Sequence, residues 1–185
     1  MIEVADIPQS VVLHRQVYQL GVKLAADGVP AYNLAGMFQL SHHKDKPWGI
    51  LSVPNALVRG VFDALHEPGV ELPLDSAGQL NAHISVMSPE DIAMVGGPEA
   101  LANDRGHQFS YNLGRLVRID DPGGWPEMRS VFALLVHAPQ LQALRRSYGL
   151  SSLPHGGEYA FHVTVGRVKR AVTGRNDKAK DTTAA

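Results

Sequence analysis

The sequence lacks cysteine entirely among its 185 residues. Disulfide bonds, thiolate metal sites and cysteine nucleophiles are therefore excluded, and a cytoplasmic location is expected. No apolar run approaches the ~20 residues that a membrane-spanning helix needs, so no membrane association is expected. The first ten residues carry acidic side chains and no apolar stretch, which is unlike a secretory signal peptide.

An excess of charge of either sign is also lacking. Lysine and arginine number 17 against 18 aspartates and glutamates, for a formal net charge of -1. Proteins that grip long nucleic acids through many phosphates usually carry a basic excess. A small anionic ligand is therefore favoured as the partner. Histidine is abundant, with nine residues, and 44% apolar residues are enough for a folded core.

The two ends of the chain are the least regular parts. Residues 11–24 fit an amphipathic helix, whereas Asp27-Gly28 between two apolar runs fits a hairpin. We favour a helix that gives way to a strand near Val22. The last segment, 171–185, is small, charged and rich in threonine, so it is expected to be a flexible tail. Residues 1–170 are expected to form one domain.

Between these ends, one order of elements occurs twice. An apolar strand is followed by a proline, an amphipathic helix, a loop and a strand of alternating polarity. Such an internal repeat predicts two structurally related halves. The first copy comprises a strand over 48–53, a helix over 56–66 with Asn55 as N-cap, and a strand over 81–87. The second comprises a strand over 130–136, a helix over 140–148 that ends at Gly149, and a strand over 159–166.

The segment between the copies is expected to be mixed. Residues 89–101 fit a helix interrupted at Gly96-Gly97, because adjacent glycines break a helix. Residues 109–119 alternate in polarity and predict either a strand pair or one bent strand. A turn is expected over 121–124.

Each copy ends in the same short motif. His83-Ile-Ser85 closes the first copy and His162-Val-Thr164 the second. Residues i and i+2 of a strand share a face, so each histidine lies beside a hydroxyl while its apolar neighbours enter the core. If a pseudo-two-fold relates the copies, the two pairs face one another across a groove.

Two histidines beside two hydroxyls suit cleavage of a phosphodiester. That reaction needs a base for the attacking oxygen and an acid for the leaving oxygen, and histidine can serve as either near neutral pH. Hydroxyl groups can hydrogen-bond the non-bridging phosphate oxygens. Two such motifs at one place in a repeat are far less expected by chance than one.

These motifs resemble those of the 2H phosphoesterase superfamily. The segment Phe161-His-Val-Thr-Val-Gly-Arg-Val168 is similar to the family's H-x-T-φ-G-R segment, and Ala82-His-Ile-Ser-Val86 has serine where threonine is commoner. The resemblance covers residues 48–169. It implies an α+β fold of two pseudo-symmetric lobes, with motifs near 83–86 and 162–165. Antiparallel sheets would form a V-shaped cleft, with helices outside.

The same resemblance implies a function. His83 and His162 would be catalytic, Ser85 and Thr164 would contact phosphate, and no metal or other cofactor would be needed. Substrates of the family include 2′,3′-cyclic phosphates, RNA ends, 2′-5′ linkages and cyclic nucleotides, and a phage branch degrades cyclic nucleotide signals of bacterial immunity.

We therefore predict a metal-independent phosphodiesterase acting on a small nucleotide, preferentially a cyclic mono-, di- or oligonucleotide. Which histidine is the acid is left open. One alternative is RNA-end processing at the same site, supported if a basic rim converges on it. Another is a non-catalytic nucleotide-binding module. The candidate rim residues are Arg115, Arg118, Arg145, Arg146, Arg167, Lys169 and Arg170.

Other residues are open to two interpretations. Tyr159 fits core packing and ligand stacking equally well. Arg167 lies on the face opposite His162 in a regular strand, so it is either structural or at the edge of the cleft. Trp48 and Tyr111 are expected in the core. The remaining histidines are expected in loops, at helix ends or on the surface, with His42 and His43 in a solvated loop and His155 in the loop before the second motif.

Overall fold

The structure is a computed structural model that describes residues 34–43, 45–65, 67–123, 125–155 and 160–170. The predictions for residues 11–34 fall on residues 1–33 or at their boundary, and the tail over 171–185 also lies outside the described residues. The fold is of the α+β class, with antiparallel strands and separate helices.

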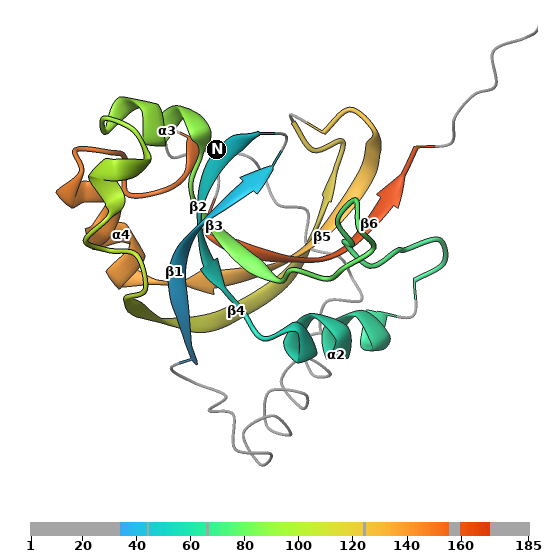
Figure 1. Cartoon of the computed structure of the whole chain (residues 1–185). Coiled ribbons are helices and arrows are strands. Elements are labelled where there is room, and N and C mark those ends of the chain that lie inside the picture. Colours follow the sequence, from blue (N-terminus) through green and yellow to red (C-terminus); the bar gives the residue numbers. More distant parts are fainter. Residues whose placement is uncertain (1–33, 44, 66, 124, 156–159, 171–185) are drawn as a thin grey trace, which may run out of the picture.

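Six antiparallel strands form a closed barrel in the order β1-β2-β3-β6-β5-β4, and β4 pairs back onto β1 (Figure 1). Each half of the chain contributes three consecutive strands. The halves therefore meet along two seams, β3 with β6 and β1 with β4, and form one strand assembly. Two lobes and a V-shaped cleft stay predictions. The strands are β1 (Leu34–His43), β2 (Lys46–Ser52), β3 (His83–Met87), β4 (Gln108–Asp120), β5 (Met128–His137) and β6 (His162–Lys169).

The first predicted repeat unit is present as β2, α2 (Asn55–Leu65) and β3. Asn55 is the first residue of the helix, and its Oδ1 accepts a hydrogen bond from the backbone N–H of Ala82 at 3.0 Å. The predicted N-cap role is therefore wrong, because the Asn55 side chain bonds no N–H of its own helix but ties the helix to the residue just before β3. This bond fixes the approach of the chain to the first motif.

The second unit is present as β5, α4 (Pro139–Ser147) and β6. Proline at the first helical position suits a helix start, and Gly149 adopts a positive φ of 72° just past its end. The interrupted helix between the copies is confirmed as α3 (Pro89–Met94) and the short 3₁₀ helix η1 (Pro98–Leu101). Gly96 and Gly97 separate them with φ values of 100° and 94°.

Two strands differ from expectation. β4 is one long strand with an irregular register between Leu113 and Leu116, which agrees with the bent-strand alternative. β1 was missed, because its burial alternates without a matching alternation of polarity: Gly36 is buried and Met37 is exposed. His42 and His43 end this strand instead of lying in a loop, although both remain exposed.

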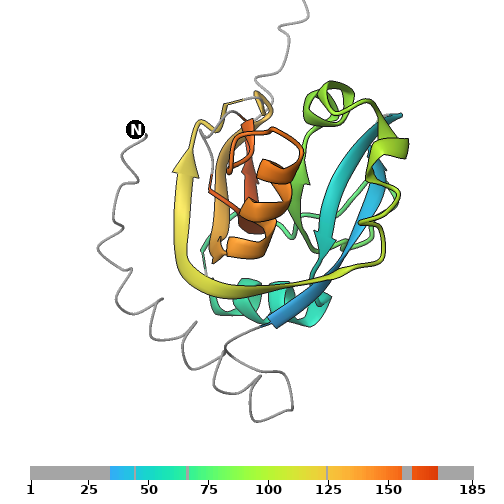
Figure 2. The same ribbon diagram turned by 90° about the vertical axis from the view of Figure 1, so that its left-hand side faces the viewer.

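The strands have a core face and a second face, which we name the site face. Paired residues across the assembly define the core face, and they are almost fully buried. Helix α2 packs on this face near β6 (Figure 1), while α3 and α4 lie side by side at the other end (Figures 1 and 2). Core-face pairs are Phe38 with Leu51, Leu51 with Ile84, Ile84 with Val163, and Val163 with Leu134.

A buried ion pair joins α3 to α4. The Arg145 guanidinium is fully buried and donates to Asp91 at 2.8 and 3.4 Å, to the carbonyl of Ser151, and to the carbonyl of Val86 in β3. Asp91 also accepts from the backbone N–H of Ser88 in a capping box. These bonds hold both helices against the end of β3, one residue beyond the first motif.

Candidate active site

The candidate catalytic residues lie where β3 meets β6. The two strands pair at Ile84 and Val163, whose side chains are fully buried on the core face. Residues immediately before and after such a pair point to the opposite face. The structure therefore places both motifs together on the site face. The four residues concerned are His83, Ser85, His162 and Thr164.

Antiparallel register sets the spacing of these side chains. The pairing of Ile84 with Val163 puts His83 across from Thr164, and Ser85 across from His162. Directly opposite Cβ atoms in such strands are about 4.5–5.5 Å apart, and diagonal ones roughly 7–8 Å. The two histidines are diagonal neighbours, so a tetrahedral phosphate between them would be within reach of both rings.

The two imidazole rings are anchored in the same way. Nδ1 of His83 lies 2.7 Å from the carbonyl oxygen of Asn81, and Nδ1 of His162 lies 2.9 Å from that of Ala160. A carbonyl oxygen only accepts, so each Nδ1 must carry a hydrogen and donate it. Nε2 of each ring is then the atom that exchanges a proton on the site face.

The strands flanking the two histidines differ in polarity. Ser52 of β2 lies across from His83, and its Oγ accepts a hydrogen bond from the backbone N–H of Met37 at 3.1 Å. Leu135 of β5 lies across from His162. His83 is exposed and His162 is half-buried. The apparent symmetry of the motifs therefore does not extend to their surroundings.

Burial lowers the pKa of His162. The hydrogen bond to the Ala160 carbonyl acts in the opposite direction, and the charges of His83 and His155 lower the pKa further. The neutral form of His162 is thus favoured near neutral pH, with Nε2 as a proton acceptor.

A strand irregularity changes the face of Arg167. Thr164 lies opposite Ala133 on β5, whereas Arg167 lies opposite Val131. Ala133 and Val131 are two residues apart and share a face, so Arg167 lies on the site face. The expectation that it points the other way assumed a regular strand. Its guanidinium donates to the carbonyl of Leu74 at 3.0 Å, and its Nε has no partner within the described residues.

The comparison with protein families gives the family to which the chain belongs. The Swiss Army Knife, 2H phosphoesterase domain matches residues 50–173, which is more than half of the chain. The chain belongs to the 2H phosphoesterase family. This membership indicates hydrolysis of phosphodiester bonds and supports the superfamily predicted from the sequence. No curated protein and no solved structure matches the chain.

The aromatic residues of this 2H phosphoesterase divide between core and site. Tyr111 is buried in the core as expected, and burial raises its pKa to about 12. Trp48 was expected in the core but is only half-buried. It lies on the site face, because the register places it opposite Ser41 and two residues from Ile50. Tyr159 lies outside the described residues.

Sequence reasoning missed the residues that flank the motifs across the barrel. Ser52 lies at the end of a predicted strand, and Leu135 lies within another, but neither segment shows which strand it pairs with. His155 was expected in a loop, but its backbone is 3₁₀-helical, and the residue is exposed. Its charge lowers the pKa of His162.

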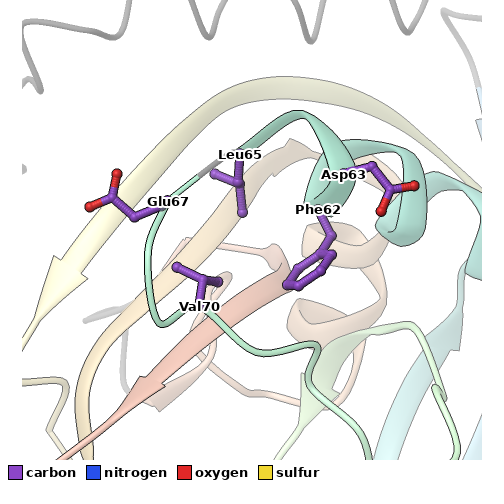
Figure 3. A pocket seen from close by; sticks show the side chains of 5 residues that line it. All are labelled: Phe62, Asp63, Leu65, Glu67 and Val70. Carbon is purple, nitrogen blue, oxygen red and sulfur yellow. The ribbon is translucent and has the colours of Figure 1, made fainter.

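The hollow beside α2 is a separate feature (Figure 3). It has a volume of about 260 Å³ and is lined by residues of α2 and of the segment that follows it, none of which belongs to the motifs. Phe62, Leu65 and Val70 supply its apolar lining, and its charged residues are Asp63 and Glu67. Two carboxylates would repel a phosphate, so this hollow does not suit the family's substrates.

Most residues of the proposed basic rim are already neutralised. Arg145 is buried with Asp91, so it cannot contact RNA. Arg167 uses its guanidinium on a backbone carbonyl. Three others form ion pairs: Arg118 with Asp120 and Glu67, Lys169 with Glu71, and Arg170 with Asp121.

Neither a metal-binding cluster nor a membrane-spanning helix is present in the part of the chain that the structure describes. Within residues 34–170, leaving out the gaps named above, no group of three or more histidine, aspartate or glutamate residues is placed to hold a metal ion. Within the same part of the chain, no helix has both the length and the apolar character for crossing a membrane. A metal-free mechanism and a cytoplasmic location stay predictions.

Proposed function

We propose that the chain is a phosphodiesterase in which His83 and His162 act as general acid and base without a metal. The observation that carries this proposal is the pairing of Ile84 with Val163, which sets both motifs on one face as diagonal neighbours. General acid–base catalysis requires such groups within reach of one phosphorus atom. Family membership supports the same chemistry.

The two roles are assigned from the surroundings of the rings. His162 is the base: its pKa is lowered by burial, so Nε2 is free to take the proton of the attacking oxygen. His83, exposed on β3, is the acid and gives a proton from Nε2 to the leaving oxygen as the P–O bond breaks. Each catalytic cycle therefore moves one proton onto His162 and one off His83, and solvent restores both.

Ser85 and Thr164 complete the site. Each is half-buried and lies directly across from the histidine of the other motif. Their hydroxyls would donate to the two non-bridging oxygens, where negative charge grows in the transition state. Arg167, on the same face, would stand at the edge of the phosphate site.

The proposed substrate is a small nucleotide, preferentially a cyclic mono-, di- or oligonucleotide, including the signalling nucleotides that phage members of the superfamily degrade. The net charge of -1 and the ion pairs of Arg118, Lys169 and Arg170 support a small ligand over a long RNA. RNA-end processing and nucleotide binding without catalysis are the competing outcomes of the experiment below.

The experiment incubates the protein with cyclic mono-, di- and trinucleotides, 2′-5′ oligoadenylate and RNA ending in a 2′,3′-cyclic phosphate. EDTA is present throughout, and products are read by mass spectrometry. Replacing either histidine, His83→Ala or His162→Ala, should lower kcat by about 10²–10⁴-fold with KM nearly unchanged. His107→Ala, in an exposed position before β4, is the matched control and should keep parental activity.

Each outcome discriminates between the functions. Parental rates in both histidine variants would refute the catalytic assignment. Preference for the RNA substrate, with an affinity that falls steeply with salt, would favour RNA-end processing. Recovery of every ligand intact after long incubation, together with measurable binding, would favour the non-catalytic module.

A further inference from the structure

The site face continues beyond the motifs along β2. Ser52 lies across from His83 and Ile50 across from Ser85, so successive site-face residues of β2 run past the catalytic pair. Trp48 is the next residue of this row, about 7 Å further along the strand at roughly 3.4 Å per residue. A half-buried indole ring therefore lies on the same face as the motifs, further along β2.

A second ring faces this tryptophan. The imidazole of His155 lies 6.5 Å from the Trp48 ring, measured between centroids, at an interplanar angle of 56°. His155 adopts a φ of 50°, which is unfavourable for a residue with a side chain and holds the imidazole at this place. The charge of His155 also lowers the pKa of His162.

Neither ring of this pair belongs to the buried core. Trp48 is outside the buried core cluster, and His155 is exposed. Two aromatic rings at the open end of a phosphate site are typical of nucleobase recognition, because every base presents a flat face for stacking.

We propose that Trp48 and His155 form a nucleobase subsite, in which the base of the scissile nucleotide stacks on Trp48 and meets His155 at its edge. This inference rests on the proposed phosphodiesterase function and deepens it. It makes Trp48 and His155 specificity-determining residues, and it assigns the substrate class as a nucleotide with its base on the β2 side of the phosphate. Substrates without a base lack this contact.

The test measures binding independently of turnover. The chain has two tryptophans, so Trp125→Phe leaves Trp48 as the only fluorescent indole. This variant is titrated with the four nucleoside 5′-monophosphates and with ribose 5-phosphate. At least one nucleotide should quench the Trp48 emission and bind about 5- to 150-fold more tightly than ribose 5-phosphate, as expected for roughly 1–3 kcal/mol of stacking per base.

Three variants then locate the contact by calorimetry. Trp48→Ala should lose the preference for the nucleotide while keeping the affinity for ribose 5-phosphate, and Trp48→Tyr should restore most of the preference. His155→Ala should weaken nucleotide binding alone. Equal affinities for nucleotides and ribose 5-phosphate, or nucleotide affinity unchanged in Trp48→Ala, would overturn the subsite. Either result leaves the phosphodiesterase proposal standing, because that proposal depends on His83→Ala and His162→Ala.

Discussion

The buried ion pair between Arg145 and Asp91 leads to a strong prediction about stability. Arg145→Met keeps much of the side-chain volume but removes the charge and four hydrogen bonds. Asp91 then keeps only the Ser88 N–H, and the carbonyls of Val86 and Ser151 lose their donor. Breaking one half of a buried pair typically costs about 3–5 kcal/mol.

This loss is large compared with the roughly 5–15 kcal/mol that stabilises an ordinary domain. At an m-value of about 2 kcal/mol per molar, the urea midpoint should fall by about 1.5–2.5 M. The measurement is urea unfolding followed by circular dichroism. Arg146→Met is the matched control, since Arg146 is exposed in the next position of the same helix, and it should change the midpoint little.

A double variant separates the charge from the packing. Arg145→Met combined with Asp91→Asn removes the uncompensated carboxylate, while the amide oxygen still accepts from Ser88. Part of the lost stability should therefore return. A single variant that costs less than 1 kcal/mol, or a double variant less stable than the single one, would refute the reasoning.

The pair also gives a dependence on pH. Burial raises the pKa of Asp91, but the hydrogen bonds from Arg145 and Ser88 and the charges of Arg145 and His155 together lower it from its ordinary 3.8. A carboxyl pKa that is lower in the folded state stabilises the protein above the unfolded pKa. That contribution is lost as pH falls from 3.8 through the folded pKa, and Arg145→Met should show a smaller loss over this range.

Three further predictions concern single positions. Leu135→Ser should hydrate His162, which lies across from it, and so raise the lowered pKa of His162 toward 6.5. The acidic limb of the pH profile of kcat/KM should then move to higher pH. An acidic limb at the parental pH would contradict the assignment of His162 as base. Gly166→Ala should cost about 1–3 kcal/mol in thermal unfolding, because the new methyl group would lie 2.6 Å from Val70 Cγ1; a neutral change would show that α2 and its following loop yield easily. Tyr148→Phe should cost about 1 kcal/mol of unfolding free energy, because it removes the hydrogen bond to Asp104. Burial, and then Asp104, raise the pKa of Tyr148 to about 12, so the variant should lose one high-pH transition in an ultraviolet titration. An ultraviolet titration identical to that of the parent would contradict the environment described.

Elements with a clear local pattern could be predicted from the sequence. The strand–proline–helix–strand units appear at nearly the predicted bounds, since apolar periodicity and proline position are local properties. The shared face of His83 and Ser85 follows from strand alternation alone. Their meeting with the second motif was a consequence of the inferred repeat, which fixed the order of elements correctly.

Features that depend on strand pairing could not be predicted. The face of Arg167 depends on a bulge, and one additional residue reverses the alternation beyond it. Arg145 reads as a surface residue in a helix, and only the packing of α3 against α4 explains its burial. Trp48 was predicted in the core, because the sequence of a strand does not show which of the strand's two faces other elements will cover.

The seam between β3 and β6 has a consequence for how the protein is made. β6 is the last strand of the described chain, and it supplies His162. It pairs with β3 on one side and with β5 on the other, and so closes the barrel. During synthesis, β3 and β5 expose unpaired edges until this strand arrives, and such edges invite association with other chains. No earlier intermediate can hold both imidazoles, so catalytic turnover would report only on molecules whose final strand has docked.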